Sequence, residues 1–263
     1  MAVISVAAWS APGKLKGSSR GWALLATPPL AAVLLASMVA LGAVTTAMSV
    51  KPTAQQIRMF VGALPHQYDV QMGLSIVVYL SVLLAIWILL PKRGTASFGS
   101  YFRRVPWPSI GLSLLSGVVF AIGIGWTFVY LAEHKLVAFH TTAGERAMLP
   151  HDLGQLGVGL LAVAVVGPLV EEVYFRGLLL RWLQTKMPLA LAALPNAALF
   201  AAVHFRFSTH VGPEGWVLTG GLFMFGLFAS AWAGALKSVW PSFAAHGMYN
   251  ATLISLPVLA SWM

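Results

Sequence analysis

The sequence of 263 residues contains no cysteine. This absence excludes disulfide bonds, cysteine nucleophiles, zinc–thiolate sites and iron–sulfur clusters. Charge is also scarce, because Asp, Glu, Lys and Arg make up 9% of the residues, against about 25% in typical soluble domains. The sequence has neither the HExxH pattern of zinc proteases nor a recognisable internal repeat.

Hydrophobic residues are abundant instead. They account for 59% of the chain, and the mean hydropathy is +0.82, which predicts a polytopic membrane protein. The net charge of +9 comes mainly from basic residues in short segments between apolar runs. We therefore expect these residues to set the membrane topology and to meet anionic lipid headgroups, and we expect no nucleic-acid partner.

The apolar runs predict an all-α, polytopic transmembrane helix bundle of about seven spans. The first, Trp22–Val50, is interrupted at two prolines, and residues 1–20 before it form a basic cytoplasmic segment; residues 21–263 then form one membrane domain. The other expected spans are Met72–Leu90, Ile110–Ala132, Leu153 to about Gln184, a fifth that follows Met187–Pro188 and includes His204, Trp216–Leu236 and Val239–Trp262.

The distribution of lysine and arginine predicts the orientation. With the N-terminus inside, ten of the fifteen basic residues outside the spans lie in inner segments, which favours an outer C-terminus. The short loops and the lack of an organelle-targeting signal suggest a bacterial inner membrane. The sequence does not predict an oligomeric state.

Two adjacent glutamates and an arginine interrupt the apolar run AVAVVGPLVEEVYFRGLLL, which begins at Ala162. Ionisable groups at hydrocarbon depth cost at least about 2.5 kcal/mol each, so they mark functional sites by default. In a helix, Glu172 and Arg176 are i,i+4 neighbours, whereas Glu171 lies about 100° away around the axis. Arg176 is therefore expected to hold Glu172 and to leave Glu171 free.

Further polar residues lie in the later apolar runs. His204 ends the run LFAAVHF, one turn after Phe200, while His246 and Asn250 share one helix face in PSFAAHGMYN. A single histidine in a helix is more often structural than functional. Polar groups at helical spacing on three helices predict a common polar cavity, lined by the fourth, fifth and seventh spans.

The motifs EExxxR at 171–176, FxxxH at 200–204 and HxxxN at 246–250 occur in this order on successive spans. Together they resemble the three motifs of the CPBP family, also called Abi, which contains CAAX prenyl endopeptidases and bacteriocin-processing or immunity proteins. The resemblance covers a core of about residues 150–260. It implies an intramembrane glutamate endopeptidase that uses no metal and no cofactor. Its substrate would be a hydrophobic or lipidated peptide or protein, with a CAAX-like or C-terminal sorting-tail segment.

The resemblance also implies roles for individual residues. Glu171 would be the general base that activates water, assisted by His204. His246 and Asn250 would donate hydrogen bonds to the tetrahedral oxyanion. Three further residues would support the local structure and the charge of the site: Glu172, Arg176 and Phe200.

This mechanism requires Glu171 and His204 to meet. If the membrane-embedded part of the fourth span began at Leu153, Glu171 would lie about 27 Å along it, too far from His204 on the opposite-running fifth span. We therefore predict a long, tilted or kinked helix with Glu171 near mid-depth and in contact with His204.

Other interpretations remain open at this stage. Glu171 with two histidines has the composition of a catalytic zinc site. Serine chemistry would have to involve Ser230, or Ser242 with His246. A proton-relaying transporter would place acids and histidines similarly, but it is expected to contain repeats. A non-catalytic peptide-binding or immunity protein is a further alternative.

Overall fold

The computed structural model describes residues 68–90, 97–137, 149–205 and 213–260. Helices dominate these residues, and none of them forms a strand, so the all-α prediction is confirmed for this part of the chain. The expected first span and the N-terminal segment lie outside the described residues. The helical elements are α3 (Tyr68–Leu89), η2 (Phe98–Tyr101), α4 (Trp107–Glu133), α6 (Leu153–Gly159), η3 (Leu160–Val166), α7 (Gly167–Glu172), η4 (Val173–Leu180), α8 (Arg181–Leu183), α9 (Leu189–Phe205), α10 (Pro213–Leu236) and α11 (Trp240–Ala260).

Elements α6 to α8 run into one another as a single helix of 31 residues, Leu153–Leu183, here called the long helix. It is one of four described helices that are long and apolar enough to cross a membrane; the others contain Gln71–Ile88, Trp107–Glu133 and Gly215–Leu236. Helix α9 has 17 residues, and α11 has 21 residues but carries polar groups. The structure therefore supports four spans among its described residues, and seven remains a prediction.

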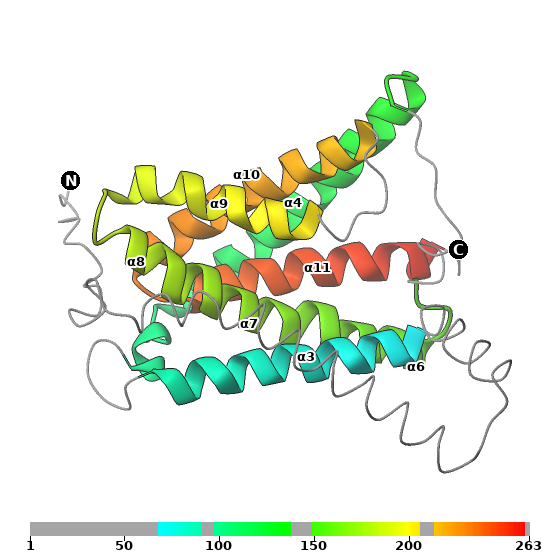
Figure 1. The fold of residues 1–263 in the computed structure, drawn as a ribbon. Helices are drawn as coiled ribbons and strands as arrows, with labels where there is room; N and C mark the ends of the chain where they lie inside the picture. Colours follow the sequence, from blue (N-terminus) through cyan, green and yellow to red (C-terminus); the bar gives the residue numbers. More distant parts are fainter. Residues whose placement is uncertain (1–67, 91–96, 138–148, 206–212, 261–263) are drawn as a thin grey trace, which may run out of the picture.

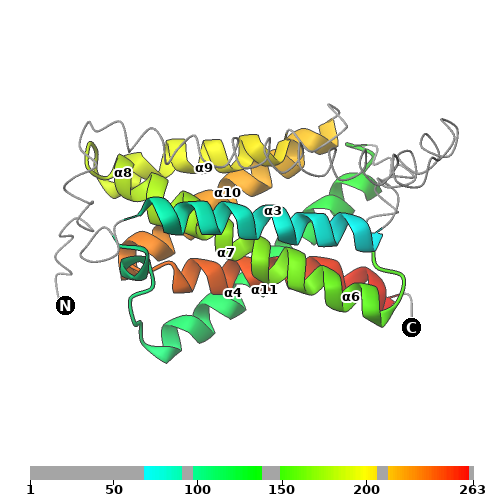
Figure 2. The same cartoon turned by 60° about the horizontal axis from the view of Figure 1, so that its bottom comes forward.

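Helix α11 lies at the centre of the described bundle (Figure 1), where it packs against α4 on one side and against η3 and α7 of the long helix on the other. Helices α9 and α10 form a pair that runs side by side in both views (Figures 1 and 2). Helix α3 packs against α6, η3 and α7. The long helix thus packs against α3, α9, α10 and α11, and the side chains that reach its glutamates come from α3, α9 and α11.

Apart from Glu171, Glu172 and Arg176 inside the long helix, the described charged side chains lie at the two ends of the bundle. Element η2, α8 and the turn between α10 and α11 lie at the same end in Figures 1 and 2. The segments at this end contain only basic charged residues: Arg103, Arg104, Arg181, Lys186 and Lys237. The opposite end, where α3 and α6 begin and α4 ends, contains Asp69, Glu133, Lys135 and Asp152.

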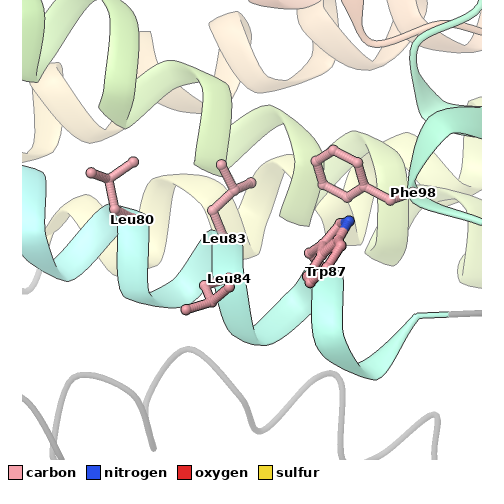
Figure 3. A pocket seen from close by; sticks show the side chains of 5 residues that line it. All are labelled: Leu80, Leu83, Leu84, Trp87 and Phe98. Atoms are coloured by element: carbon pink, nitrogen blue, oxygen red, sulfur yellow. The ribbon is translucent and has the colours of Figure 1, made fainter. Parts of the chain in front are cut away.

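An apolar pocket of about 260 Å³ lies between α3 and η2 (Figure 3). Its lining residues are all hydrophobic: Leu80, Leu83, Leu84, Trp87 and Phe98. None of the polar residues singled out from the sequence lines it. The predicted polar cavity between the fourth, fifth and seventh spans is therefore not confirmed, and the candidate site has to be described from its side-chain contacts.

Candidate active site

The glutamates lie between two wide, π-helical segments of the long helix, η3 and η4. In η3 the amide of Gly167 bonds the carbonyl of Ala162, five residues earlier, and Pro168 has no amide to donate. The carbonyl of Val163 therefore loses its usual helical donor, and the side-chain amide of Asn250 donates to it at 2.7 Å. The neighbouring carbonyl of Ala164 approaches α11 so closely that a Cβ atom at Gly247 would lie 2.6 Å from it.

The second wide segment, η4, is fixed in the same manner by another asparagine. Asn196 of α9 is fully buried and donates through Nδ2 to the carbonyl of Phe175 at 2.7 Å. Its Oδ1 accepts a hydrogen bond of 3.1 Å from Ser230 of α10. Asn196 was not predicted as a site residue, although a polar amide inside the apolar run LALAALPNAALF indicates a buried hydrogen bond.

Glu172 and Arg176 form the i,i+4 ion pair that the helical spacing predicts. Arg176 Nη1 lies 3.1 Å from Glu172 Oε1, and both side chains are fully buried. The guanidinium also donates to the carbonyl of Gly226 at 3.2 Å and lies 4.6 Å from the centre of the Phe200 ring. His246 Nδ1 completes the pair at 2.9 Å from Glu172 Oε1. Both partners therefore hold Glu172 Oε1, whereas Oε2 is buried without a hydrogen-bond partner. The side chain of Glu172 is fully buried, which keeps it out of reach of a substrate.

Glu171 occupies a different environment, in which its two oxygens are unequal. Oε1 accepts a hydrogen bond of 2.7 Å from the hydroxyl of Tyr79 on α3. Oε2 is buried and has no hydrogen-bond partner in the structure. It lies 3.5 Å from His204 Nε2 and 3.8 Å from His246 Nε2. The predicted meeting of Glu171 and His204 is confirmed, because Glu171 lies just past the middle of the long helix rather than near its end.

Both imidazoles present Nε2 to Glu171 because their Nδ1 atoms are bonded elsewhere. His204 Nδ1 lies 2.8 Å from the carbonyl of Phe200, which can only accept, so this nitrogen carries a proton. His246 Nδ1 faces the Glu172 carboxylate and donates to it in the same way. Phe200 also packs its ring against both imidazoles, with centroid distances of 4.5 Å to His204 and 5.6 Å to His246.

Six of the seven residues singled out from the motifs are thus brought together around Glu171 and Glu172. Asn250 is the exception, since its side-chain amide bonds the carbonyl of Val163 in η3. The serines named as alternative nucleophiles bond backbone carbonyls: Ser242 that of Val239 and Ser230 that of Gly226. No group of three His, Cys, Asp or Glu residues in the described ranges is spaced to hold a metal ion.

Apolar helices of spanning length identify an integral membrane protein, and the buried acid–imidazole cluster gives it a candidate hydrolytic site. Residues 154–252 match the family model described as type II CAAX prenyl endopeptidase Rce1-like. This segment contains all seven motif residues, and its match to a protease-family model confirms the resemblance to the CPBP family. Neither a curated protein nor a solved structure matches the chain. Helices α3 and α4 lie outside the matched segment.

Proposed function

We propose that this protein is an intramembrane endopeptidase that hydrolyses a peptide bond with water activated by Glu171. The observation that carries the proposal is the environment of Glu171 Oε2. This oxygen is buried and has no hydrogen-bond partner, and two imidazole nitrogens lie within 4 Å of it. The Glu171 side chain is 15% exposed and that of His204 is 30% exposed, so the pair lies near the surface of the described bundle. The match to a protease-family model supports the same conclusion.

A water molecule fits this arrangement chemically. It would donate one hydrogen to Glu171 Oε2 and the other to His204 Nε2, leaving an oxygen lone pair for attack on a carbonyl carbon. Glu171 would take the first proton as the new C–O bond forms. The proton would then pass to the amide nitrogen as the C–N bond breaks, which returns the carboxylate to its starting state.

Stabilisation of the tetrahedral intermediate falls to α11. With Nδ1 held by Glu172, His246 would contribute its Nε2 as a donor in the doubly protonated imidazolium form. One amide hydrogen of Asn250 is bonded to Val163, so its second amide hydrogen would supply the other oxyanion contact. Glu172, Arg176 and Phe200 would act as supports, because they hold His246 and α9 in place.

The substrate proposed for this site has a hydrophobic or lipidated segment, either CAAX-like or a C-terminal sorting tail. We also propose a bacterial inner-membrane location for a single membrane domain spanning residues 21–263. The segments at one end of the described bundle carry basic charges only, which supports placing that end on the inner face and the end of α11 on the outer face.

The experiment that tests the function measures cleavage of peptides with hydrophobic or prenylated tails by the full chain in detergent. Glu171→Ala should lower kcat by about 100- to 10,000-fold, because a positioned general base contributes that much. Glu133→Ala is the matched control, since Glu133 is an exposed glutamate at the end of α4. Full activity of Glu171→Ala would contradict the proposal and favour the peptide-binding or immunity alternative.

A chelator added to the same assay tests the zinc alternative. That alternative keeps some support, because zinc-binding histidines also donate Nδ1–H to a carbonyl or a carboxylate. Activity that survives the chelator agrees with metal-free chemistry. Activity that is lost and then restored by added zinc would make Glu171, His204 and His246 ligands.

A further inference from the structure

We propose that Tyr79 is a positioning residue for the glutamate base, so that α3 completes a site whose other residues come from the family-matched segment. This inference rests on the proposed function and adds a residue that the three motifs do not contain. Tyr79 acts through Glu171 and not on the substrate. By bonding Oε1 of Glu171, it leaves Oε2 of the same carboxylate for the proposed water.

The contact itself is short and charge-assisted. The Tyr79 hydroxyl donates to Glu171 Oε1 at 2.7 Å, within the range of strong hydrogen bonds between a neutral donor and a carboxylate. Both imidazoles face the other oxygen, Oε2. The phenol therefore stops the carboxylate from rotating and directs the free lone pairs of Oε2 toward the position proposed for water.

The long helix provides a space that fits the phenol ring. A Cβ atom at Gly167 would lie 3.2 Å from Cε2 and 3.4 Å from Cζ of Tyr79. The same Cβ atom would lie 3.1 Å from the carbonyl oxygen of Ala162 in η3, so a larger residue would press on both the ring and the backbone of the long helix. Gly167 lies one turn before Glu171, so the glycine that admits the ring also places its hydroxyl beside the carboxylate.

A second tyrosine on α3 lacks this arrangement and provides a control. Tyr68 also packs on a glycine of the long helix, because a Cβ atom at Gly159 would overlap its hydroxyl. The Tyr68 hydroxyl is buried but has no hydrogen-bond partner. Both tyrosines thus lie on α3 and pack against a glycine of the long helix. Only the Tyr79 hydroxyl bonds a carboxylate.

The test compares Tyr79→Phe with Tyr68→Phe in the peptide-cleavage assay, with rates normalised to folded protein by size-exclusion chromatography. Each change removes one hydroxyl and keeps the ring. Tyr79→Phe should lower kcat about 10- to 100-fold and leave KM within twofold, because a hydrogen bond to a charged group is lost while the substrate contacts remain. Tyr68→Phe should leave both constants unchanged.

Gly167→Ala tests the same contact from the other side. Alone it should lower kcat, because the added Cβ presses on the Tyr79 ring and on the carbonyl of Ala162. In the Tyr79→Phe background the added loss should be smaller, because the hydrogen bond that a displaced ring would break is already absent. Wild-type kcat for Tyr79→Phe, or equal losses in the two Tyr→Phe variants, would overturn the proposal while an inactive Glu171→Ala left the proposed function standing. An active Glu171→Ala would remove the proposed function and this inference together.

Discussion

The two wide segments of the long helix have the same construction but different surroundings. Segment η3 precedes the glutamates and is fixed by Asn250 of α11; segment η4 follows them and is fixed by Asn196 of α9. Each asparagine lies on a helix that also carries one of the two histidines. The long helix is therefore tied on both sides of its acids to the helices that supply the imidazoles.

The difference lies in burial and in the remaining capacity for hydrogen bonds. Asn196 is fully buried, donates to Phe175 and accepts from Ser230, whereas Asn250 is only partly buried and donates to Val163 alone. An amide with an unused hydrogen can still donate to a substrate, whereas an amide whose donor and acceptor are both engaged serves the fold. We infer that η4 is the structural attachment and η3 the functional one.

The largest expected effect comes from the ion pair between Arg176 of η4 and Glu172, the last residue of α7. Arg176→Ala should destabilise the protein by about 3–5 kcal/mol, because it leaves the buried Glu172 carboxylate without its counter-charge. The measurement is denaturant unfolding in detergent, with Arg104→Ala as an exposed control. Similar unfolding midpoints for the two variants would show that the pair does not hold η4 to the glutamates.

Asn250→Ala should act mainly on the rate. Loss of a preorganised oxyanion donor costs about 100- to 1,000-fold in kcat, or roughly 2.7–4 kcal/mol. The unfolding midpoint should move less than it does for Asn196→Ala, because the carbonyl of Val163 belongs to a partly exposed contact. A large loss of stability with an unchanged kcat would make η3 an attachment of the same kind as η4.

Helical periodicity allowed several features to be predicted. It placed the expected span Met72–Leu90 close to the observed α3, and it paired Glu172 with Arg176 at i,i+4. The Glu171–His204 contact was predicted because the two residues lie on helices that run in opposite directions. Their side chains can meet only if both lie at the same depth in the membrane. These predictions succeeded because they depend on local geometry and on the high cost of burying charge.

Tyr79 and Asn196 were missed because neither carries a charge and each stands in an apolar run that already predicts a helix. The wide segments were missed for another reason. A spacing of 100° per residue assumes regular turns, whereas η3 depends on Pro168 and on a bond from Asn250, which lies 87 residues after Val163 in the sequence. Tertiary contacts of this kind leave no local pattern.

Asn196→Leu should lower the free energy of unfolding by about 1–3 kcal/mol, because the buried carbonyl of Phe175 and the hydroxyl of Ser230 both lose a partner. The value of kcat per folded molecule should fall far less than in Asn250→Ala. Thermal unfolding and cleavage rates measured on both variants check this contrast. If the rate fell equally in the two variants, η4 would have to be assigned to the reactive part of the molecule.

The smallest effect is expected at Ser230, which tests both the attachment and the serine alternative. Its one hydroxyl hydrogen is shared between Asn196 Oδ1, at 3.1 Å from Oγ, and the carbonyl of Gly226, at 2.8 Å. Ser230→Ala should cost about 0.5–1.5 kcal/mol of stability, the usual net value of one hydrogen bond, and should leave kcat unchanged. The control is Ser81→Ala on the exposed side of α3, which removes a hydroxyl of the same kind. Ala229→Ser would be unsuitable, because it adds a buried polar group. A folded Ser230→Ala protein without peptidase activity would restore serine chemistry and remove Glu171 from its proposed role.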